Sequence, residues 1–168
     1  MSEHENLNRG DAIAKLKTIA SGEIAMLGTF SAPFSVSCRP MATQAVDDDG
    51  TLWFFSGKGS EKNEDIADNS VVSVTYALPN KSEYVSLSGV ASIERDQQKI
   101  DELWTAWAKP WFGEGPTDPN LTLIRVRPTA GQYWDTKHNR MVQLLGIAVG
   151  MVTGQPLDDG VTGSLRLG

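Results

Sequence analysis

The chain has 168 residues, of which 40% are hydrophobic, and this is enough to bury the core of one globular domain. Its formal net charge of −6 argues against general binding to nucleic acid or to anionic membranes, because both need a basic surface. One cysteine, Cys38, and two histidines exclude a disulfide framework and argue against a metal site. The polar N-terminus and the lack of a long apolar run predict a cytoplasmic protein with no signal peptide and no membrane span.

Residues 1–8 are expected to be disordered, and residues 9–153 to form one domain. Asn8 can cap a helix that runs to Ser21, and Gly22 ends it. Strands are expected at residues 23–30 and 36–46. The second strand contains Pro40, which lacks the N–H group of an inner ladder and so indicates an edge, a bulge or a bend.

The stretch 39–62 is the feature around which the rest is organised. Two β-rich runs flank an Asp-Gly pair, which is a strong hairpin signal. A loop of residues 49–50 and a loop of residues 47–50 give different registers, and both place Arg39 opposite residues 58–60.

A helix from Ser60 to Asp68 is expected behind this hairpin, with Ser60 as its cap and Lys62 in its first turn. Backbone N–H groups, hydroxyls and cations then converge, which predicts a site for a phosphate or another small anion. The alternative is that Arg39 and Lys62 only pair with acidic residues of the same region, namely Glu61, Glu64 or Asp65.

Two further strands are expected at residues 71–78 and 83–94, with Gly89 a bulge or a point of close approach. Asp96 is expected to cap a helix with one buried stripe, formed by Ile100, Leu103, Trp104 and Trp107.

A loop over residues 111–119 carries two adjacent aromatics, Trp111 and Phe112, that no periodicity explains. The last expected strand covers residues 121–134, a weak helix pattern covers 140–153, and residues 154–168 are expected to be a flexible tail. About six strands with short links favour an antiparallel sheet or a closed barrel over a parallel one.

Several short motifs follow one another in a fixed order. They are Arg39-Pro40-Met41, Leu52-Trp53-Phe54 with Ser60-x-Lys62, the strand Val85 to Gly89, Asp96 to Trp104, Trp111-Phe112, and Tyr133-Trp134-Asp135. Together they resemble the flavin-binding split-barrel proteins related to pyridoxamine 5′-phosphate oxidase, and more closely the general stress protein branch. The resemblance covers residues from about 10 to 155. It implies a mainly β fold with peripheral helices, a six-stranded antiparallel split β-barrel, and a homodimer with FMN, or else FAD, at its interface.

The resemblance also assigns roles by position. Arg39 and Lys62 would bind the FMN phosphate, with Ser56 and Ser60 as hydroxyl donors. Trp134 would reach the flavin from the partner subunit. The full set of expected cofactor-binding residues is Arg39, Pro40, Met41, Ala42, Thr43, Phe55, Ser56, Ser60, Lys62, Trp111 and Trp134.

Departures from the oxidase pattern matter more for activity than for cofactor binding: one removes a phosphate cation, and two remove groups that contact substrate. Glu61 stands where the oxidase has a second arginine, Gln44 stands where it has a lysine that contacts substrate, and Val142 replaces the histidine two residues after Arg140. Oxidation of pyridoxamine phosphate is therefore not expected.

We expect a flavin-binding general stress protein with flavin-dependent redox activity on an unidentified small molecule. No residue stands out as a general acid or base, so catalytic residues are not assigned. One alternative is a flavin store or redox sensor without turnover. Another is a haem-binding protein, which is disfavoured because His138 is the only histidine outside the N-terminal segment.

Overall fold

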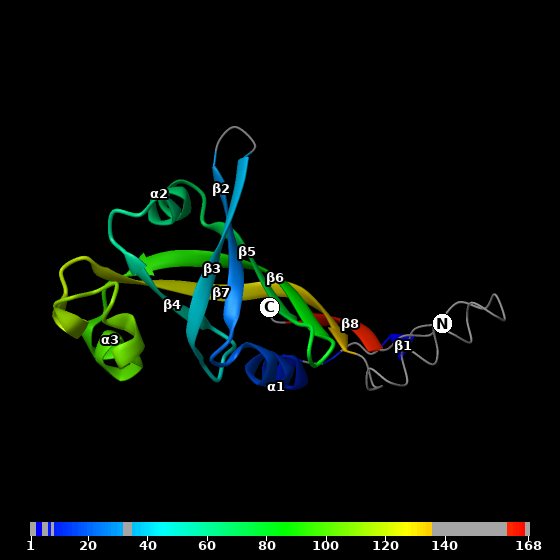
Figure 1. Cartoon of the computed structure of the whole chain (residues 1–168). Helices are drawn as coiled ribbons and strands as arrows, with labels where there is room; N and C mark the ends of the chain where they lie inside the picture. The colour runs from blue at the N-terminus through cyan, green and yellow to red at the C-terminus, as the bar shows by residue number, and fades with distance from the viewer. Residues whose placement is uncertain (1–2, 5–6, 8, 32–34, 136–160, 167–168) are drawn as a thin grey trace.

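A closed barrel of six antiparallel strands forms the centre of the molecule (Figure 1), a computed structural model that describes residues 3–4, 7, 9–31, 35–135 and 161–166. The strands are β2 (Ile24–Ser31), β3 (Ser35–Val46), β4 (Leu52–Gly57), β5 (Val71–Leu78), β6 (Glu83–Glu94) and β7 (Leu121–Asp135). They are hydrogen-bonded in the order β7-β4-β3-β2-β5-β6, and pairing of β6 with β7 closes the barrel. The predicted fold class is confirmed.

Three α-helices lie outside the strands in the described part of the chain: α1 (Arg9–Ala20), α2 (Glu61–Asp68) and α3 (Gln97–Leu103). Two short 3₁₀ turns, η1 (Ala106–Ala108) and η2 (Gly115–Thr117), follow α3. The helix α1 ends as expected at Gly22, whose φ of 74° suits a residue without a side chain. None of the described helices is long and apolar enough to cross a membrane.

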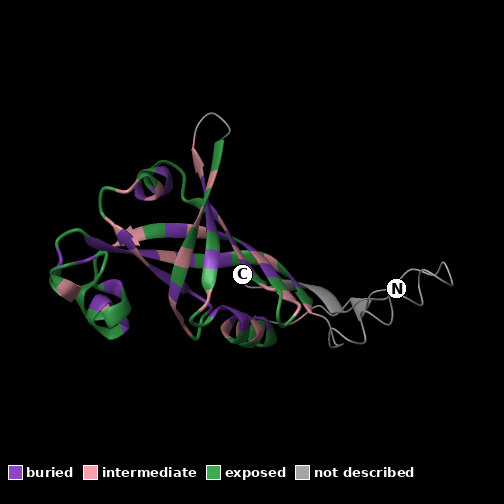
Figure 2. Cartoon of the chain, in the orientation of Figure 1, coloured by how far each residue is buried: buried purple, intermediate pink, exposed green. Residues whose placement is uncertain are grey.

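Two hydrophobic clusters hold these elements together. Buried residues alternate with more exposed ones along β5 and β6, so one face of each strand lines the barrel interior (Figure 2). Four fully buried residues of α1 join this interior cluster: Ala12, Leu16, Ile19 and Ala20. A second cluster lies between α3 with its following loop and the opposite face of β4 and β7, and it includes Trp53, Ile100, Phe112 and Leu123.

The turn between β3 and β4 has a register between the two predicted ones. Val46 pairs with Leu52, and Gly50 has a φ of 90°, the left-handed conformation that such a turn requires. A register shift at Gln44 then brings Thr43 opposite Phe54, which is the register of the longer predicted loop.

Beyond this shift β3 and β4 separate, so the expected pairing of Arg39 with residues 58–60 is wrong. Arg39 instead pairs with Leu27 of β2. Pro40 lies in the same part of β3, where no described strand pairs with its other edge. Its interpretation as an edge residue is therefore correct, and the bulge is at Gln44 instead.

The C-terminal segment departs from the expected tail. Residues Val161–Arg166 form β8, which pairs with the second half of β7, and Glu3–His4 form a short strand β1 parallel to β8. The first half of β7 pairs with β4 along the same edge, so β8 continues an edge that β4 leaves open. Pairing with an open edge outweighs the low strand propensity of a Gly-rich segment. The weak helix pattern at residues 140–153 lies outside the described residues.

The predicted stripe of α3 is only partly correct. Asp96 caps the helix as expected, with its carboxylate 3.2 Å from the backbone nitrogen of Lys99. Ile100 and Leu103 are buried, but the helix ends at Leu103, and Trp107 is 86% exposed in η1. Because the helical period stops there, Trp107 leaves the stripe.

Candidate anion site

Arg39 is held in place by β2 and α2. Its Nη1 atom donates to the hydroxyl of Thr29 at 2.7 Å and to the backbone carbonyl of Leu27 at 3.3 Å. Thr29 in turn donates to the carboxylate of Asp65 at 2.5 Å, and Asp65 lies 3.8 Å from Nη2 of Arg39. Two buried side chains, Thr29 and Asp65, thus fix the direction of the guanidinium.

Lys62 lies near Arg39 without an acidic partner among the described residues. It is half-buried in the first turn of α2. Burial and, second, the charge of Arg39 lower the pKa of Lys62 from its ordinary value of 10.5. Two cations kept close together, one of them unpaired, make a local positive field in an acidic protein, which favours an anion.

The alternative, in which both cations only pair with acidic residues, therefore holds for one of them and not for the other among the described residues. Arg39 does pair with Asp65, one of the acids named for it. For Lys62, no such pair exists with any described residue.

Ser56 and Ser60 come together at the N-terminus of α2. Their hydroxyl oxygens are 3.2 Å apart, and Ser56 also bonds to the side chain of Asn63 at 2.7 Å. Ser60 is the N-cap residue of α2 by position, but its side chain makes no capping hydrogen bond. Its hydroxyl therefore does not serve the helix end, contrary to the expectation of a side-chain cap.

The other residues expected near the ring have mixed surroundings. Pro40 and Ala42 are exposed on β3, whereas Met41 packs partly against the barrel core. Thr43 is buried and bonds to the hydroxyl of Tyr76 at 2.7 Å. Burial raises the pKa of Tyr76 to about 12, so this hydroxyl stays protonated at neutral pH.

Phe55 is partly buried and packs against the second hydrophobic cluster. Its ring centroid is 6.0 Å from that of Trp104 and 6.3 Å from that of Phe112. Phe112, and not its neighbour Trp111, is buried there, while Trp111 is 74% exposed.

Trp134 is not brought to this site within one chain. It is 39% exposed and pairs with Tyr84 of β6 near the end of β7, whereas Ser56 pairs with Thr122 at the start of that strand.

Thr29 and Asn63 were not predicted to belong to the site, and Asp65 was predicted only as one of the acids that could pair with Arg39 or Lys62. Asn63 and Asp65 lie on a helix so polar that it suggests a solvated surface. Asn63 and Ile66 are three positions apart and both buried, so helical periodicity could have indicated the inward face. No local signal distinguishes Thr29 from other strand threonines.

Fold and site together define a split-barrel protein with a cationic site between β3, β4 and α2. Residues 11–158 match the family model described as pyridoxamine 5′-phosphate oxidase like. The chain belongs to this family.

Individual relatives agree with this assignment. Protein bli-3 of Neurospora crassa is 28% identical over 127 residues, which cover 70% of this chain and 61% of that protein. The general stress FMN/FAD binding protein of Xanthomonas citri is 26% identical with a TM-score of 0.66, over 76% of this chain and 90% of that one. A structure named for general stress protein 26, from Jannaschia sp. CCS1, has a TM-score of 0.70 at 24% identity, over 94% of this chain and 96% of that one, and this likeness shows the fold.

Proposed function

We propose that this chain is a flavoprotein that binds FMN, with the phosphate held by Arg39 and Lys62. The observation that carries the proposal is the half-buried Lys62 beside Arg39, which has no acidic partner among the residues that the structure describes. A phosphate monoester would relieve the repulsion between the two cations, and charge-assisted hydrogen bonds of this kind contribute about 1.5–3 kcal/mol each. The name of the Xanthomonas citri relative, an FMN/FAD binding protein, supports the choice of a flavin.

The donor set suits a phosphate better than a second acidic side chain. The Nη1 atom of Arg39 donates to Thr29 and Leu27, and Nη2 lies 3.8 Å from Asp65, a separation longer than a hydrogen bond that leaves N–H groups of Nη2 and Nε to donate to a phosphate. Lys62 adds a point charge, and Ser60 adds a hydroxyl from the N-terminus of α2. Met41, Ala42 and Thr43 continue β3 from Arg39 and would follow the isoalloxazine ring, with Phe55 nearby.

A homodimer completes the proposed site. Trp134 lies away from Arg39 within one chain, so it can reach the flavin only from a second copy. Exposed apolar residues on the outer face of β2, β3 and β5 give such a copy a surface to cover; they include Ile24, Met26, Val36 and Val71.

The bound flavin would supply hydride or single-electron transfer, and the protein would supply position and electrostatics. The substrate differs from that of the oxidase, because Gln44 replaces the substrate-contacting lysine. The Gln44 side chain donates to the carbonyl of Ala42 at 3.0 Å and so is used within β3. Arg140 and Val142 lie outside the described residues.

The direct experiment is to identify what the purified protein carries. We expect a yellow protein whose released chromophore has the mass and absorbance spectrum of FMN. A Soret band in its place would contradict the proposal. Reduction of the bound flavin by NAD(P)H, followed by reoxidation over many turnovers, separates redox catalysis from flavin storage.

A further inference from the structure

The buried polar groups beside α2 form a chain of hydrogen bonds in which the direction of each proton can be deduced. Its members are Ser56, Ser60, Asn63 and Thr122, here called the Asn63 network. Ser56 and Ser60 are both expected hydroxyl donors to the phosphate, and each hydroxyl has only one proton to donate.

The hydroxyl of Thr122 donates to the backbone carbonyl of Ser56 at 2.9 Å. Its oxygen can then only accept from Asn63, whose Nδ2 lies 3.1 Å away.

The same nitrogen of Asn63 lies 3.1 Å from the backbone carbonyl of Gly57. A carbonyl oxygen only accepts, so the Nδ2 side of the amide must face Gly57 and Thr122. The amide oxygen, Oδ1, therefore faces Ser56.

Ser56 must consequently be the donor in its 2.7 Å bond to Asn63 Oδ1. Its single proton is committed inward, in a side chain that is only 2% exposed. In the 3.2 Å contact between the two serines, the geometry of the pair alone allows either donor. With the Ser56 proton used, Ser60 is the donor.

We propose that Asn63 is a positioning residue that holds the Ser56 proton inward and leaves Ser60 as the hydroxyl that donates to the bound anion. This inference rests on the proposed phosphate site and changes one assignment within it: Ser56 supports Ser60 as an acceptor and does not touch the phosphate. On binding, the Ser60 proton turns from Ser56 to a phosphate oxygen. Each serine keeps one proton throughout.

Comparison of FMN with riboflavin, which lacks the phosphate, tests this in the full chain. Ser60→Ala should weaken FMN about tenfold, the loss expected for one charge-assisted hydrogen bond, and leave riboflavin unchanged. Ser60→Thr should restore FMN affinity. Ser56→Ala should change FMN and riboflavin affinities by the same factor, so that their ratio stays at the wild-type value. A structural defect alone cannot produce this difference between the two serines.

Asn63 is tested by its coupling to Ser60. In an Asn63→Ala background the Ser56 proton is released and can replace that of Ser60, so Ser60→Ala should lower the FMN-to-riboflavin ratio by a smaller factor than in the wild type. Equal factors in the two backgrounds would overturn the role of Asn63. Should Asn63→Ala fail to fold, as its melting curve would show, Asn63→Ser provides the second background.

The outcomes separate this inference from the proposed function. A wild-type protein that does not prefer FMN to riboflavin contradicts both. Preference for FMN that survives Ser60→Ala, or that is lost equally in Ser56→Ala, contradicts the inference and leaves the phosphate site standing on Arg39 and Lys62.

Discussion

Lys62 shows at the scale of one residue that binding and stability oppose each other. A half-buried cation beside Arg39, with no acidic partner in the described part of the chain, destabilises the folded protein, and an anion would relieve this. Charged groups with perturbed pKa values are common at functional sites, because there they are placed to bind a ligand even where this lowers the stability of the fold.

Lys62→Met should raise the melting temperature of the flavin-free protein, because it removes a half-buried charge. It should also weaken FMN binding by about tenfold or more, the loss of one charge-assisted contact. Lys58→Met is a matched control, because Lys58 is exposed in the turn before α2 and should change neither property. The measurements are thermal unfolding without ligand and FMN titration. A lower melting temperature for Lys62→Met would mean that Lys62 has a stabilising partner.

The pH dependence of this effect has a definite sign. The folded pKa of Lys62 lies below the ordinary 10.5, so between these two values the unfolded chain binds more protons than the folded one. The free energy of unfolding contributed by this group therefore rises with pH in that window. We expect the stability advantage of Lys62→Met to be largest near neutral pH and to shrink as pH approaches the alkaline range. An advantage that grows with pH would contradict this sign.

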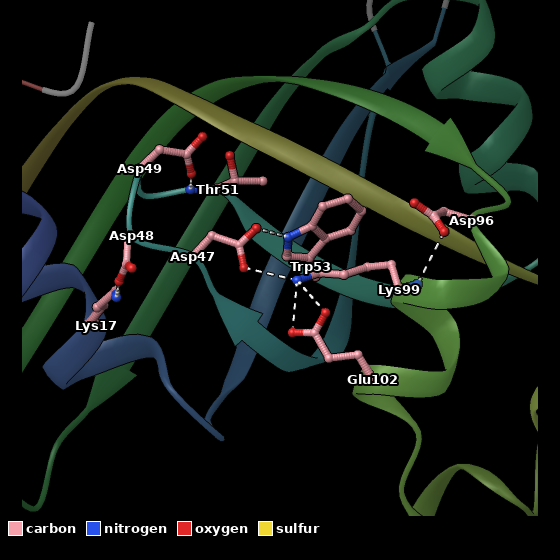
Figure 3. Close-up of polar contacts among 9 residues, drawn as sticks. All are labelled: Lys17, Asp47, Asp48, Asp49, Thr51, Trp53, Asp96, Lys99 and Glu102. Carbon is pink, nitrogen blue, oxygen red and sulfur yellow. Dashed lines mark hydrogen bonds and ion pairs between the residues drawn. The ribbon is translucent and has the colours of Figure 1, made fainter.

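At the scale of elements, α3 is attached to the turn between β3 and β4 by one polar cluster (Figure 3). Asp47 accepts from the indole nitrogen of Trp53 at 2.7 Å and from Lys99 at 3.1 Å. Lys99 also pairs with Glu102 at 3.2 Å and lies 5.2 Å from the centre of the Trp53 ring. One carboxylate thus satisfies groups from a strand and from a helix.

Removal of that carboxylate by Asp47→Ala should lower the free energy of unfolding by about 1–2 kcal/mol, because the indole N–H and the ammonium each lose a partner. Asp48→Ala is the control: this neighbour is fully exposed, and its pair with Lys17 is screened by solvent and should contribute little to stability. Urea unfolding of the three proteins measures both values. Equal effects at the two positions would show that the cluster does not attach α3.

Alkaline pH should release the same cluster. Burial lowers the pKa of Lys99, but its hydrogen bonds and charge interactions with Asp47 and Glu102 outweigh burial and leave the pKa above 10.5. Its stabilisation is therefore complete below 10.5 and lost as pH rises through the folded pKa.

Gly89 marks a point of close approach between β6 and β7. A Cβ atom at this position would lie 2.8 Å from the backbone oxygen of Arg127 and 3.0 Å from a methyl group of Val126. Because a backbone atom cannot move aside cheaply, Gly89→Ala should cost about 1–3 kcal/mol of stability. Gly59→Ala, where nothing lies within 4 Å, should be nearly neutral in the same melting experiment. Comparable losses would indicate that the barrel does not close tightly at Gly89.

At the scale of the whole molecule, the proposed dimer predicts that sites are shared between copies. Trp134→Ala and Arg39→Ala/Lys62→Ala should each bind FMN poorly alone. Mixed under conditions that allow subunit exchange, they should regain FMN binding, because each mixed dimer has one site with the cations of one copy and Trp134 of the other. No regain, with exchange verified by a mass-tagged copy, would contradict a site at the interface.

The sequence predicted much of the fold because its signals were local. The boundaries of β5 and β6 match their alternating patterns, and Gly22, Gly89 and Asp96 act as their chemistry suggests. The failures have tertiary causes. The pairing of β8 depends on an edge left open by β4, and the position of Arg39 depends on a bulge at Gln44 that separates β3 from β4.

The sequence indicated the cations of the candidate site, but not all of the residues that hold those cations in place. Arg39, Ser60 and Lys62 could be picked out because charged and hydroxyl residues gather at a turn before a helix. Thr29 could not, since no local signal marks it, and Asp65 was named only as one of three acids that could pair with Arg39 or Lys62. The inference that Ser60, and not Ser56, donates to the anion depends on the hydrogen bonds of the whole Asn63 network, which no local sequence pattern predicts.

The measurement that tests the central claim most directly is FMN titration of Arg39→Ala/Lys62→Ala against the wild type, followed by flavin fluorescence, with circular dichroism and melting temperature as folding controls. We predict that the double variant keeps the fold and loses FMN binding. A folded double variant that binds FMN as tightly as the wild type would contradict the assignment of the phosphate to these two cations.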